Sequence, residues 1–197
     1  MKVSRVHPRG GRGARKGELV FHRSQRLFLR PAFPEDCGAI LAGIGEEAIV
    51  RNLARAPWPY TLDDAKNFAA LPQDMRLPHF LVTLPGVGVI GSAGMGDHEG
   101  EPELGYWIAR AHWGRGYATE AAGAVLRIAR TLGHRRVVAG HFTDNPASGK
   151  VLRKLGFVPT GRNGQRFSAG RGCAAESVEY ALDLEADMDP APVARAA

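Results

Sequence analysis

The chain has 197 residues, 44% of them hydrophobic and 23% charged, with a formal net charge of +6 and only two cysteines, Cys37 and Cys173. This length suits one domain with a substantial core rather than two. The sequence shows no apolar run of membrane-spanning length, no secretory signal and no Cys/His cluster, which excludes membrane, secreted and zinc-dependent classes and predicts a cytoplasmic protein without metal.

The positive charge is concentrated at the N-terminus. Residues 1–30 contain nine Lys or Arg and one acid, so this segment carries +8 and the remaining chain carries −2. The stretch at 9–17 is rich in glycine and arginine but has no interleaved aromatic residue, which disfavours nucleic-acid binding. We therefore expect a flexible basic tail at 1–24, one folded domain at 25–185 and a fraying tail at 186–197.

The first half of this domain is predicted to hold one strand and two helices. The strand is expected at 26–31, and a helix at 34–53, where apolar residues share one stripe and acids occupy the first turn. The two prolines of 57–60 form a rigid loop. Thr61, followed three residues later by Asp64, resembles a capping box that opens the second helix.

The second half alternates between strands and helices. The expected elements are strands at 80–84, 87–95, 103–108 and 136–142, helices at 118–132 and from Asn145, and two last strands at 157–158 and 178–184, separated by a Gly/Ser/Arg-rich loop at 160–176. A helix links the strands at 103–108 and 136–142, so they should run parallel through a right-handed crossover. This order predicts one mixed α/β domain, with a mostly antiparallel twisted sheet of about six to seven strands and about four helices.

The most informative stretch is 113–120, which joins a glycine turn to a long amphipathic helix. Gly114 and Gly116 leave little side-chain bulk, so backbone N–H groups can face an anion. The N-terminus of the following helix adds positive potential at the same place. With the strand at 103–108 just before it, this turn has the local pattern of a phosphate-binding site.

Two common phosphate-binding patterns do not fit the chain. A P-loop requires Gly-Lys followed by Ser or Thr, whereas Gly149-Lys150 is followed by Val151. A dinucleotide-binding turn requires a third glycine where Thr119 stands, and an acid after the next strand, which is lacking at 136–142.

The turn resembles the pyrophosphate-binding turn of the GNAT superfamily of acetyl-CoA-dependent N-acetyltransferases. In that pattern Gln or Arg is followed by two residues, Gly, any residue, and Gly or Ala. Trp113 occupies the Gln/Arg position, Gly116 the glycine position and Ala118 the last small position.

A second block strengthens the resemblance. Asn145 to Ser148, followed by 151–157 with its Leu-Gly-Phe exit, is similar to the second helix of the superfamily. With the opening strand, the resemblance covers roughly 26–184 and is greatest to the branch that acetylates ribosomal-protein N-termini. It implies splayed parallel strands that hold the pantetheine arm, and acetyl transfer to a primary amine by direct attack in a ternary complex.

The resemblance also implies which residues bind acetyl-CoA as co-substrate. The backbone around the turn should hold the diphosphate, Arg115 should approach phosphate, and Lys150 or Arg153 should approach the 3′-phosphate. The full expected set is Ile108, Arg110, Trp113, Gly114, Arg115, Gly116, Tyr117, Ala118, Thr119, Asn145, Ser148, Lys150 and Arg153.

Two residues are candidates for the chemistry, which needs proton removal from the amine and stabilisation of the leaving thiolate. Glu103 is the candidate proton acceptor, directly or through water; the alternative is a solvated strand-end glutamate. Ser148 is the candidate hydrogen-bond donor to the departing sulfur; the alternative is a hydroxyl that only caps the helix. Many superfamily members carry a tyrosine that acts as general acid at the position where this chain has Leu152. A leucine side chain cannot donate a proton or a hydrogen bond.

The acceptor site is expected to include Trp58, Tyr60, Glu103 and His141, although His141 in such a position is also consistent with simple packing. An α-amine has a pKa of about 8 and a lysine side chain a pKa of about 10.4, so the α-amine loses its proton more easily at neutral pH. A site with one carboxylate therefore suits the α-amine of a protein or a small molecule better than a lysine. Glu99 and Glu101 beside Glu103 keep a polyamine or aminoglycoside acceptor open.

Two other classes remain as alternatives. One is a catalytically silent acyl-CoA-binding sensor or scaffold, which Leu152 would permit. The other is a nucleic-acid-binding protein that uses the basic tail. A homodimer is also compatible with the sequence.

Overall fold

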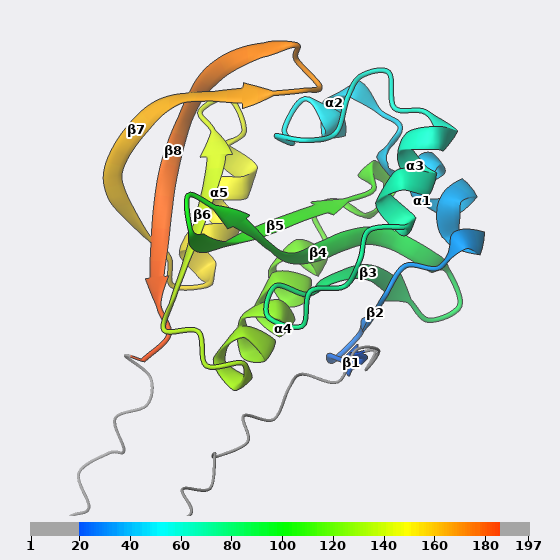
Figure 1. Cartoon of the computed structure of the whole chain (residues 1–197), viewed down its shortest axis with the longest axis horizontal. Coiled ribbons are helices and arrows are strands. Elements are labelled where there is room, and N and C mark those ends of the chain that lie inside the picture. Colours follow the sequence, from blue (N-terminus) through cyan, green and yellow to red (C-terminus); the bar gives the residue numbers. More distant parts are fainter. Residues whose placement is uncertain (1–19, 186–197) are drawn as a thin grey trace, which may run out of the picture.

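The computed structural model describes residues 20–185, so the tail predictions for 1–19 and 186–197 lie outside the described residues. One eight-stranded sheet runs through the domain in the order β1-β2-β3-β4-β5-β6-β8-β7 (Figure 1). All neighbouring strands are antiparallel except β5 and β6. The predicted mixed, mostly antiparallel sheet with one parallel pair is confirmed.

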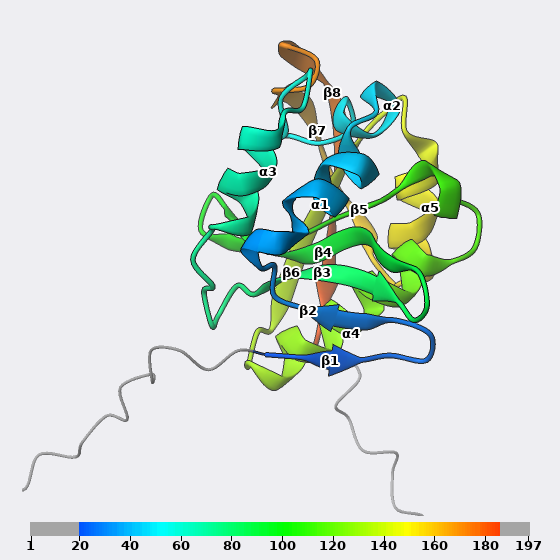
Figure 2. The same cartoon turned by 90° about the vertical axis from the view of Figure 1, so that its right-hand side faces the viewer.

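The strands are β1 (His22–Arg23), β2 (Phe28–Arg30), β3 (His79–Leu84), β4 (Gly88–His98), β5 (Glu101–Ile108), β6 (Arg136–Phe142), β7 (Val158–Ser168) and β8 (Cys173–Asp183). The α-helices are α1 (Cys37–Ile44), α2 (Glu47–Val50), α3 (Leu62–Ala69), α4 (Tyr117–Thr131) and α5 (Pro146–Lys154), and two short 3-10 helices are η1 (Pro34–Asp36) and η2 (Arg110–His112). Figure 2 shows β1 to β4 side by side in this order. No helix within residues 20–185 combines the length and apolar character needed to cross a bilayer.

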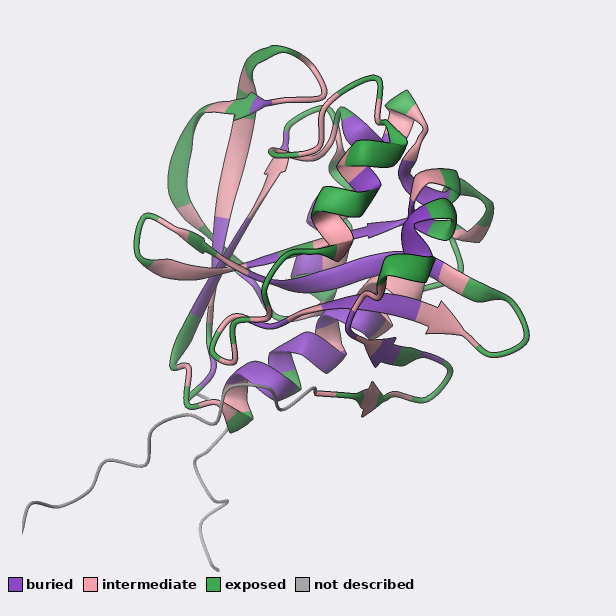
Figure 3. Cartoon of the chain, turned by 45° about the vertical axis from the view of Figure 1, so that its right-hand side comes forward, coloured by how far each residue is buried: buried purple, intermediate pink, exposed green. Residues whose placement is uncertain are grey.

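Two apolar cores lie on opposite faces of the sheet. Residues of α4 and α5 pack with Leu104 and Ile108 of β5, whereas α1, α2 and α3 pack with Trp107. This division follows from the two-residue alternation of a strand. Figure 3 shows the buried residues along the central strands and α4, whereas β7 is mostly exposed and β8 is largely of intermediate burial.

Two sequence predictions were wrong in detail. The single helix expected at 34–53 is broken into η1, α1 and α2, because α1 ends at Gly45 and Glu46 adopts extended backbone before α2 begins. The loop expected at 160–176 is a long β-hairpin, paired from Asn163↔Val178 to Ser168↔Cys173. Most residues of this segment are polar or small and much of the hairpin is exposed, so no alternation of large apolar residues marked it as a strand.

The parallel strands β5 and β6 share one bridge only, Glu103↔Val138. Beyond this point β5 continues to Ile108 and β6 to Phe142 without pairing with each other, and Figure 1 shows the two strands diverging. The start of α4 and the start of α5 follow β5 and β6 respectively, so both helix N-termini lie near the end where the strands part. This divergence positions the candidate site.

Candidate active site

The glycine turn before α4 has an open backbone. Gly114 and Gly116 have φ of 73° and 78°, in the left-handed region that glycine adopts without strain. A Cβ added at Gly114 would meet no atom within 4 Å, and one at Gly116 would meet only Arg26 Nη2, at 3.6 Å. Because α4 has 15 residues and no side chain caps its start, its N-terminal N–H groups are free to bind an anion.

The side chains beside the turn leave this backbone uncovered. The Trp113 indole N–H donates to the carbonyl oxygen of Ile108 at 2.6 Å, which fixes the ring at the end of β5, yet the residue is 47% exposed. Tyr117 lies under the guanidinium of Arg26, 4.6 Å from the ring centroid. Arg115 is exposed, and its carbonyl oxygen accepts a hydrogen bond from Arg26 at 3.1 Å. The turn therefore presents uncovered backbone N–H groups that suit an anion such as a phosphate.

Arg26 is a cation of this site that the sequence did not reveal. It comes from the β1–β2 turn, and its backbone N–H and Nε donate to Glu120 at 2.6 and 2.7 Å. Ser24 Oγ also donates to Glu120, at 2.7 Å. Desolvation of the Glu120 carboxyl is outweighed by these hydrogen bonds, so its pKa is lowered. Arg26 reaches the turn only through its tertiary contact with Glu120, which lies 94 residues away in the sequence.

A pair of hydroxyls links β5 to α5, the helix that follows β6. Ser148 Oγ lies 2.8 Å from the hydroxyl of Tyr106, which also lies 3.3 Å from the Ser148 carbonyl oxygen. Burial raises the pKa of Tyr106 to about 12. The start of α5 is capped by Asn145, whose side chain accepts from the Ser148 N–H at 3.4 Å. Sequence analysis assigned Tyr106 no role, because only packing places it against α5.

Glu103 is held by an arginine on the opposite face of β5. Arg166 of β7 donates from Nη2 to Oε2 at 2.8 Å and from Nη1 to Oε1, and the carboxylate side chain is only 13% exposed. The bond to Glu103 raises the pKa of Arg166. Gly140 of β6 makes room, because a Cβ there would lie 3.1 Å from Arg166 Nη1. Glu103 is thus neither a freely solvated glutamate nor an unpaired base.

His141 does not join Glu103. Its Nδ1 lies 2.8 Å from the carbonyl oxygen of Phe142, and its ring packs on Tyr180 with the centroids 5.5 Å apart. Its Nε2 is buried against Gly149 of α5 without a hydrogen-bond partner among the described residues. Since Gly140 faces Arg166, the alternation of β6 directs His141 to the α5 face, which favours the packing interpretation.

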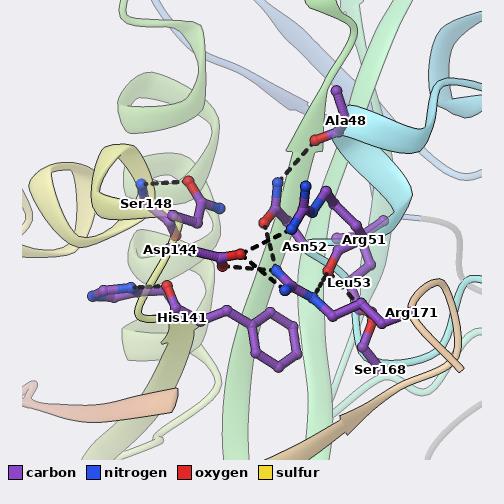
Figure 4. Close-up of polar contacts among 11 residues, drawn as sticks. Ala48, Arg51, Asn52, Leu53, His141, Asp144, Ser148, Ser168 and Arg171 are labelled. Carbon is purple, nitrogen blue, oxygen red and sulfur yellow. Dashed lines mark hydrogen bonds and ion pairs between the residues drawn. The ribbon is translucent and has the colours of Figure 1, made fainter. Parts of the chain in front are cut away.

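The tip of the β7–β8 hairpin is fastened to the segment after α2 and to the loop before α5 (Figure 4). Arg171 donates through Nη1 and Nη2 to Asp144 at 2.9 and 2.7 Å, and through Nε to the Arg51 carbonyl oxygen at 2.7 Å. Its guanidinium lies 4.7 Å from the Phe142 ring centroid. Ser168 Oγ donates to the carbonyl oxygen of Leu53 at 2.8 Å. We call these contacts the Arg171 clasp; it joins the hairpin to the segment after α2 and to the loop before α5.

The remaining predicted residues lie in several places. Tyr60 packs against the α1–α3 core, where burial raises its pKa to about 12, whereas Trp58 is exposed. Arg110 forms a surface ion pair with Glu46 at 3.3 Å. Arg153 donates to the Tyr180 hydroxyl at 3.0 Å. Of the other predicted cofactor residues, Lys150 is exposed on α5, Thr119 is half-buried in the first turn of α4, and Ala118 packs against the main core.

Comparison with known proteins identifies the family. The sequence model of the acetyltransferase (GNAT) domain matches residues 26–158. The chain is 30% identical over 148 residues to "Uncharacterized N-acetyltransferase YoaA" of Bacillus subtilis (strain 168), an alignment that covers 70% of this chain and 82% of that protein. It is 39% identical over 147 residues to "Uncharacterized N-acetyltransferase p20" of Bacillus licheniformis, with the same coverage of 70% and 82%.

Solved structures share the fold. The acetyltransferase (GNAT family) from Bacillus anthracis superposes with a TM-score of 0.72 at 22% identity, covering 84% of this chain and 99% of that one. The RimL ribosomal L7/L12 α-N-protein acetyltransferase in complex with coenzyme A gives 0.69 at 21% identity, covering 86% and 100%. The matched domain, the curated relatives and this shared fold lead to one conclusion: the chain belongs to the GNAT family of acetyltransferases.

Proposed function

We propose that this acetyltransferase transfers the acetyl group of acetyl-CoA to a primary amine, preferentially the α-amine of a protein N-terminus or a similar small molecule, by direct attack in a ternary complex. The observation that carries the proposal is the open glycine turn at α4, next to the diverging end of β5 and β6. RimL, which shares the fold, is named as an α-N-protein acetyltransferase and was solved with coenzyme A.

The residues around the turn match the parts of an acyl-CoA. The backbone from Gly114 to Ala118 would hold the diphosphate, with Arg26 and Arg115 as neighbouring cations. Exposed Lys150 and Arg153 on α5 would be available to the 3′-phosphate. The pantetheine arm would follow β5 past Ile108 and place the thioester beside Ser148.

The reaction requires a neutral amine as nucleophile, so a protonated amine must first lose its proton. Leu104 and Ile108 of β5 face α4 and α5, so Glu103 and its partner Arg166 lie on the other face of the sheet. An amine bound beside Glu103 would therefore reach the thioester from the side opposite α4 and α5. Because Arg166 donates hydrogen bonds to both oxygens of the Glu103 carboxylate, Glu103 would receive the amine proton through a water molecule or after Arg166 has moved away. An α-amine, which titrates near about 8, needs less help than a lysine near about 10.4.

The surrounding charges argue against a polycationic acceptor. Glu101 pairs with Arg136 at 2.9 Å and with Arg162 at 3.7 Å, and Glu103 pairs with Arg166. Two of the three glutamates that would attract a polyamine therefore already have arginine partners. This arrangement supports an acceptor with a single amine.

A mass-spectrometric amine panel with acetyl-CoA tests the proposal. It compares lysine-free peptides with a free N-terminus, the same peptides blocked at the N-terminus and carrying one lysine, spermidine, and an aminoglycoside. We expect acetylation of free N-termini with matching release of coenzyme A. Turnover of the polycations alone would favour the polyamine or aminoglycoside alternative. Tight acetyl-CoA binding without release of coenzyme A from any amine would favour the sensor.

A further inference from the structure

We propose that Tyr106 is a positioning residue for acetyl transfer: its hydroxyl holds the Ser148 hydroxyl so that the serine proton points at the leaving sulfur. This inference rests on the proposed function of the same site. It assigns a role to a side chain of the sheet that neither the resemblance nor the comparisons supply.

The hydroxyl pair lies where the strands have parted. Tyr106 is three residues beyond Glu103, the last residue of β5 that pairs with β6. Ser148 lies in the first turn of α5, which follows β6. The 2.8 Å contact between the two hydroxyls therefore spans from β5 to α5 across the opening in which the thioester would lie.

The Ser148 hydroxyl is not needed to cap α5. The backbone N–H of Ser148 is already bonded to the Asn145 carbonyl oxygen at 3.2 Å and to the Asn145 side chain at 3.4 Å. Within residues 20–185, the Ser148 Oγ has one hydrogen-bond partner, the Tyr106 hydroxyl. A purely capping role would leave this contact unexplained, and Leu152, one turn later, is 1% exposed and has no donor to offer.

The geometry of the hydroxyl pair allows the direction that the proposal requires. The Tyr106 phenol, with a pKa of about 12, keeps its proton at neutral pH, and either hydroxyl of the 2.8 Å contact can be the donor. In the proposed arrangement Tyr106 donates to Ser148 Oγ rather than to the Ser148 carbonyl oxygen, which lies 3.3 Å away. With the phenol proton donated to the serine oxygen, the serine proton is free to point toward sulfur. As negative charge develops there, the chain from Tyr106 to Ser148 to sulfur is polarised in one direction.

The reaction balances without proton transfer from Tyr106. The amine nitrogen forms the N–C bond, the C–S bond breaks with its electron pair on sulfur, and the amine proton leaves toward Glu103 or water. A thiol has a pKa of about 8.5, so a thiolate is too weak a base to deprotonate this phenol. The serine therefore stabilises the thiolate by hydrogen bonding, and Tyr106 acts through it.

The kinetic test is a double-mutant cycle with Tyr106→Phe, Ser148→Ala and both together. We expect each single variant to lower kcat about tenfold, as for loss of a hydrogen bond to a charged group, with the KM for acetyl-CoA nearly unchanged. The double variant should be no slower than Ser148→Ala, because Tyr106 acts through Ser148. An unchanged kcat in Tyr106→Phe, or effects of the two changes that multiply, would overturn the proposal.

The matched control is Ser92→Ala. Ser92 is a buried hydroxyl of β4 that donates to the Phe80 carbonyl oxygen at 2.9 Å, so its loss removes an internal hydrogen bond away from the hydroxyl pair. We expect lower thermal stability with unchanged kcat. Melting curves of all variants separate loss of folded protein from loss of rate.

A readout without an acceptor separates this inference from the proposed function. The pH dependence of thiolate absorbance of bound coenzyme A reports how well the site stabilises the thiolate. We expect the bound thiol to ionise at higher pH in Tyr106→Phe and Ser148→Ala than in the wild type. Equal ionisation in all three would overturn the role of Tyr106. A normal thiol shift in a wild-type protein that acetylates no amine would instead overturn the proposed function alone.

Discussion

Arg166 of β7 binds Glu103 of β5 through both terminal nitrogens, and its side chain passes Gly140 of β6, one of the two strands that lie between β5 and β7 in the sheet. The pair joins the hairpin on the acceptor side to the strand on which the thioester is proposed to lie. A side chain at position 140 would crowd Arg166. The ion pair therefore links the β7–β8 hairpin, which would border the bound amine, to Glu103, the proposed proton acceptor.

The first prediction concerns Glu103 as proton acceptor. Glu103→Gln should lower kcat by about a hundredfold, as expected for a general base, with little change in the KM for acetyl-CoA. Glu101→Gln, on the same strand and also bound to arginine, is the control and should retain its rate. A rate in Glu103→Gln equal to that of the control would assign Glu103 a structural role.

The second prediction concerns the glycine turn. Gly116→Ala should cost about 1–2 kcal/mol of stability, because its φ of 78° is left-handed. It should also weaken binding of coenzyme A, measured by calorimetry, since a Cβ would enter the open backbone. Gly133→Ala is a matched control: its φ is 82°, a Cβ there meets no atom within 4 Å, and it lies past the other end of α4. If both variants bound coenzyme A equally well, the turn would not be the phosphate site.

The third prediction concerns the Arg171 clasp. Arg171→Ala releases the hairpin from Asp144 and from the Arg51 carbonyl oxygen. It should raise the KM for the amine severalfold and leave the affinity for acetyl-CoA unchanged. Arg135→Ala removes an exposed arginine–carboxylate pair with Glu185 and is the control. Equal amine KM values in the two variants would show that the clasp does not shape the acceptor site.

The fourth prediction concerns pH-dependent stability. The pKa of Glu120 is lowered from its ordinary value of 4.5, because hydrogen bonds from Arg26 and Ser24 outweigh desolvation. The folded state thus binds this proton less readily than the unfolded chain, so the stabilisation is present above 4.5 and is lost as pH falls through the folded-state pKa.

Glu120→Gln should therefore lower the free energy of unfolding at neutral pH by about 1 kcal/mol, a modest value because Arg26 is 44% exposed. The difference from wild type should shrink as the pH falls below 4.5 and through the lowered pKa of the folded state. Urea unfolding at several pH values measures it. Glu176→Gln, an exposed glutamate of β8, is the control and should show no such trend. A gap independent of pH would contradict the assignment.

Local sequence signals predicted much of the fold. The Thr61–Asp64 capping box is confirmed, with both reciprocal hydrogen bonds present, and the strand at 136–142 has the predicted bounds. The amphipathic helix after the glycine turn lies within one residue of its predicted position. These features depend on hydrogen bonds and apolar spacing within a few residues. The exposed β7–β8 hairpin lacked such a signal and was predicted as a loop.

The sequence by itself predicted the alternation of strands and helices around the glycine turn and the parallel crossover, because these depend on local spacing and on the connection between two strands. It did not predict β1, the break between α1 and α2, or the extent of the β7–β8 hairpin. Only the tertiary structure decided which side chains meet: Arg26 with Glu120, Arg166 with Glu103 and Tyr106 with Ser148 are 94, 63 and 42 residues apart. The physical reason is that strand pairing and helix packing bring distant segments together through contacts that no local spacing encodes. The resemblance predicted an acetyl-donor site at the glycine turn, whereas packing determined the partner of each candidate catalytic group.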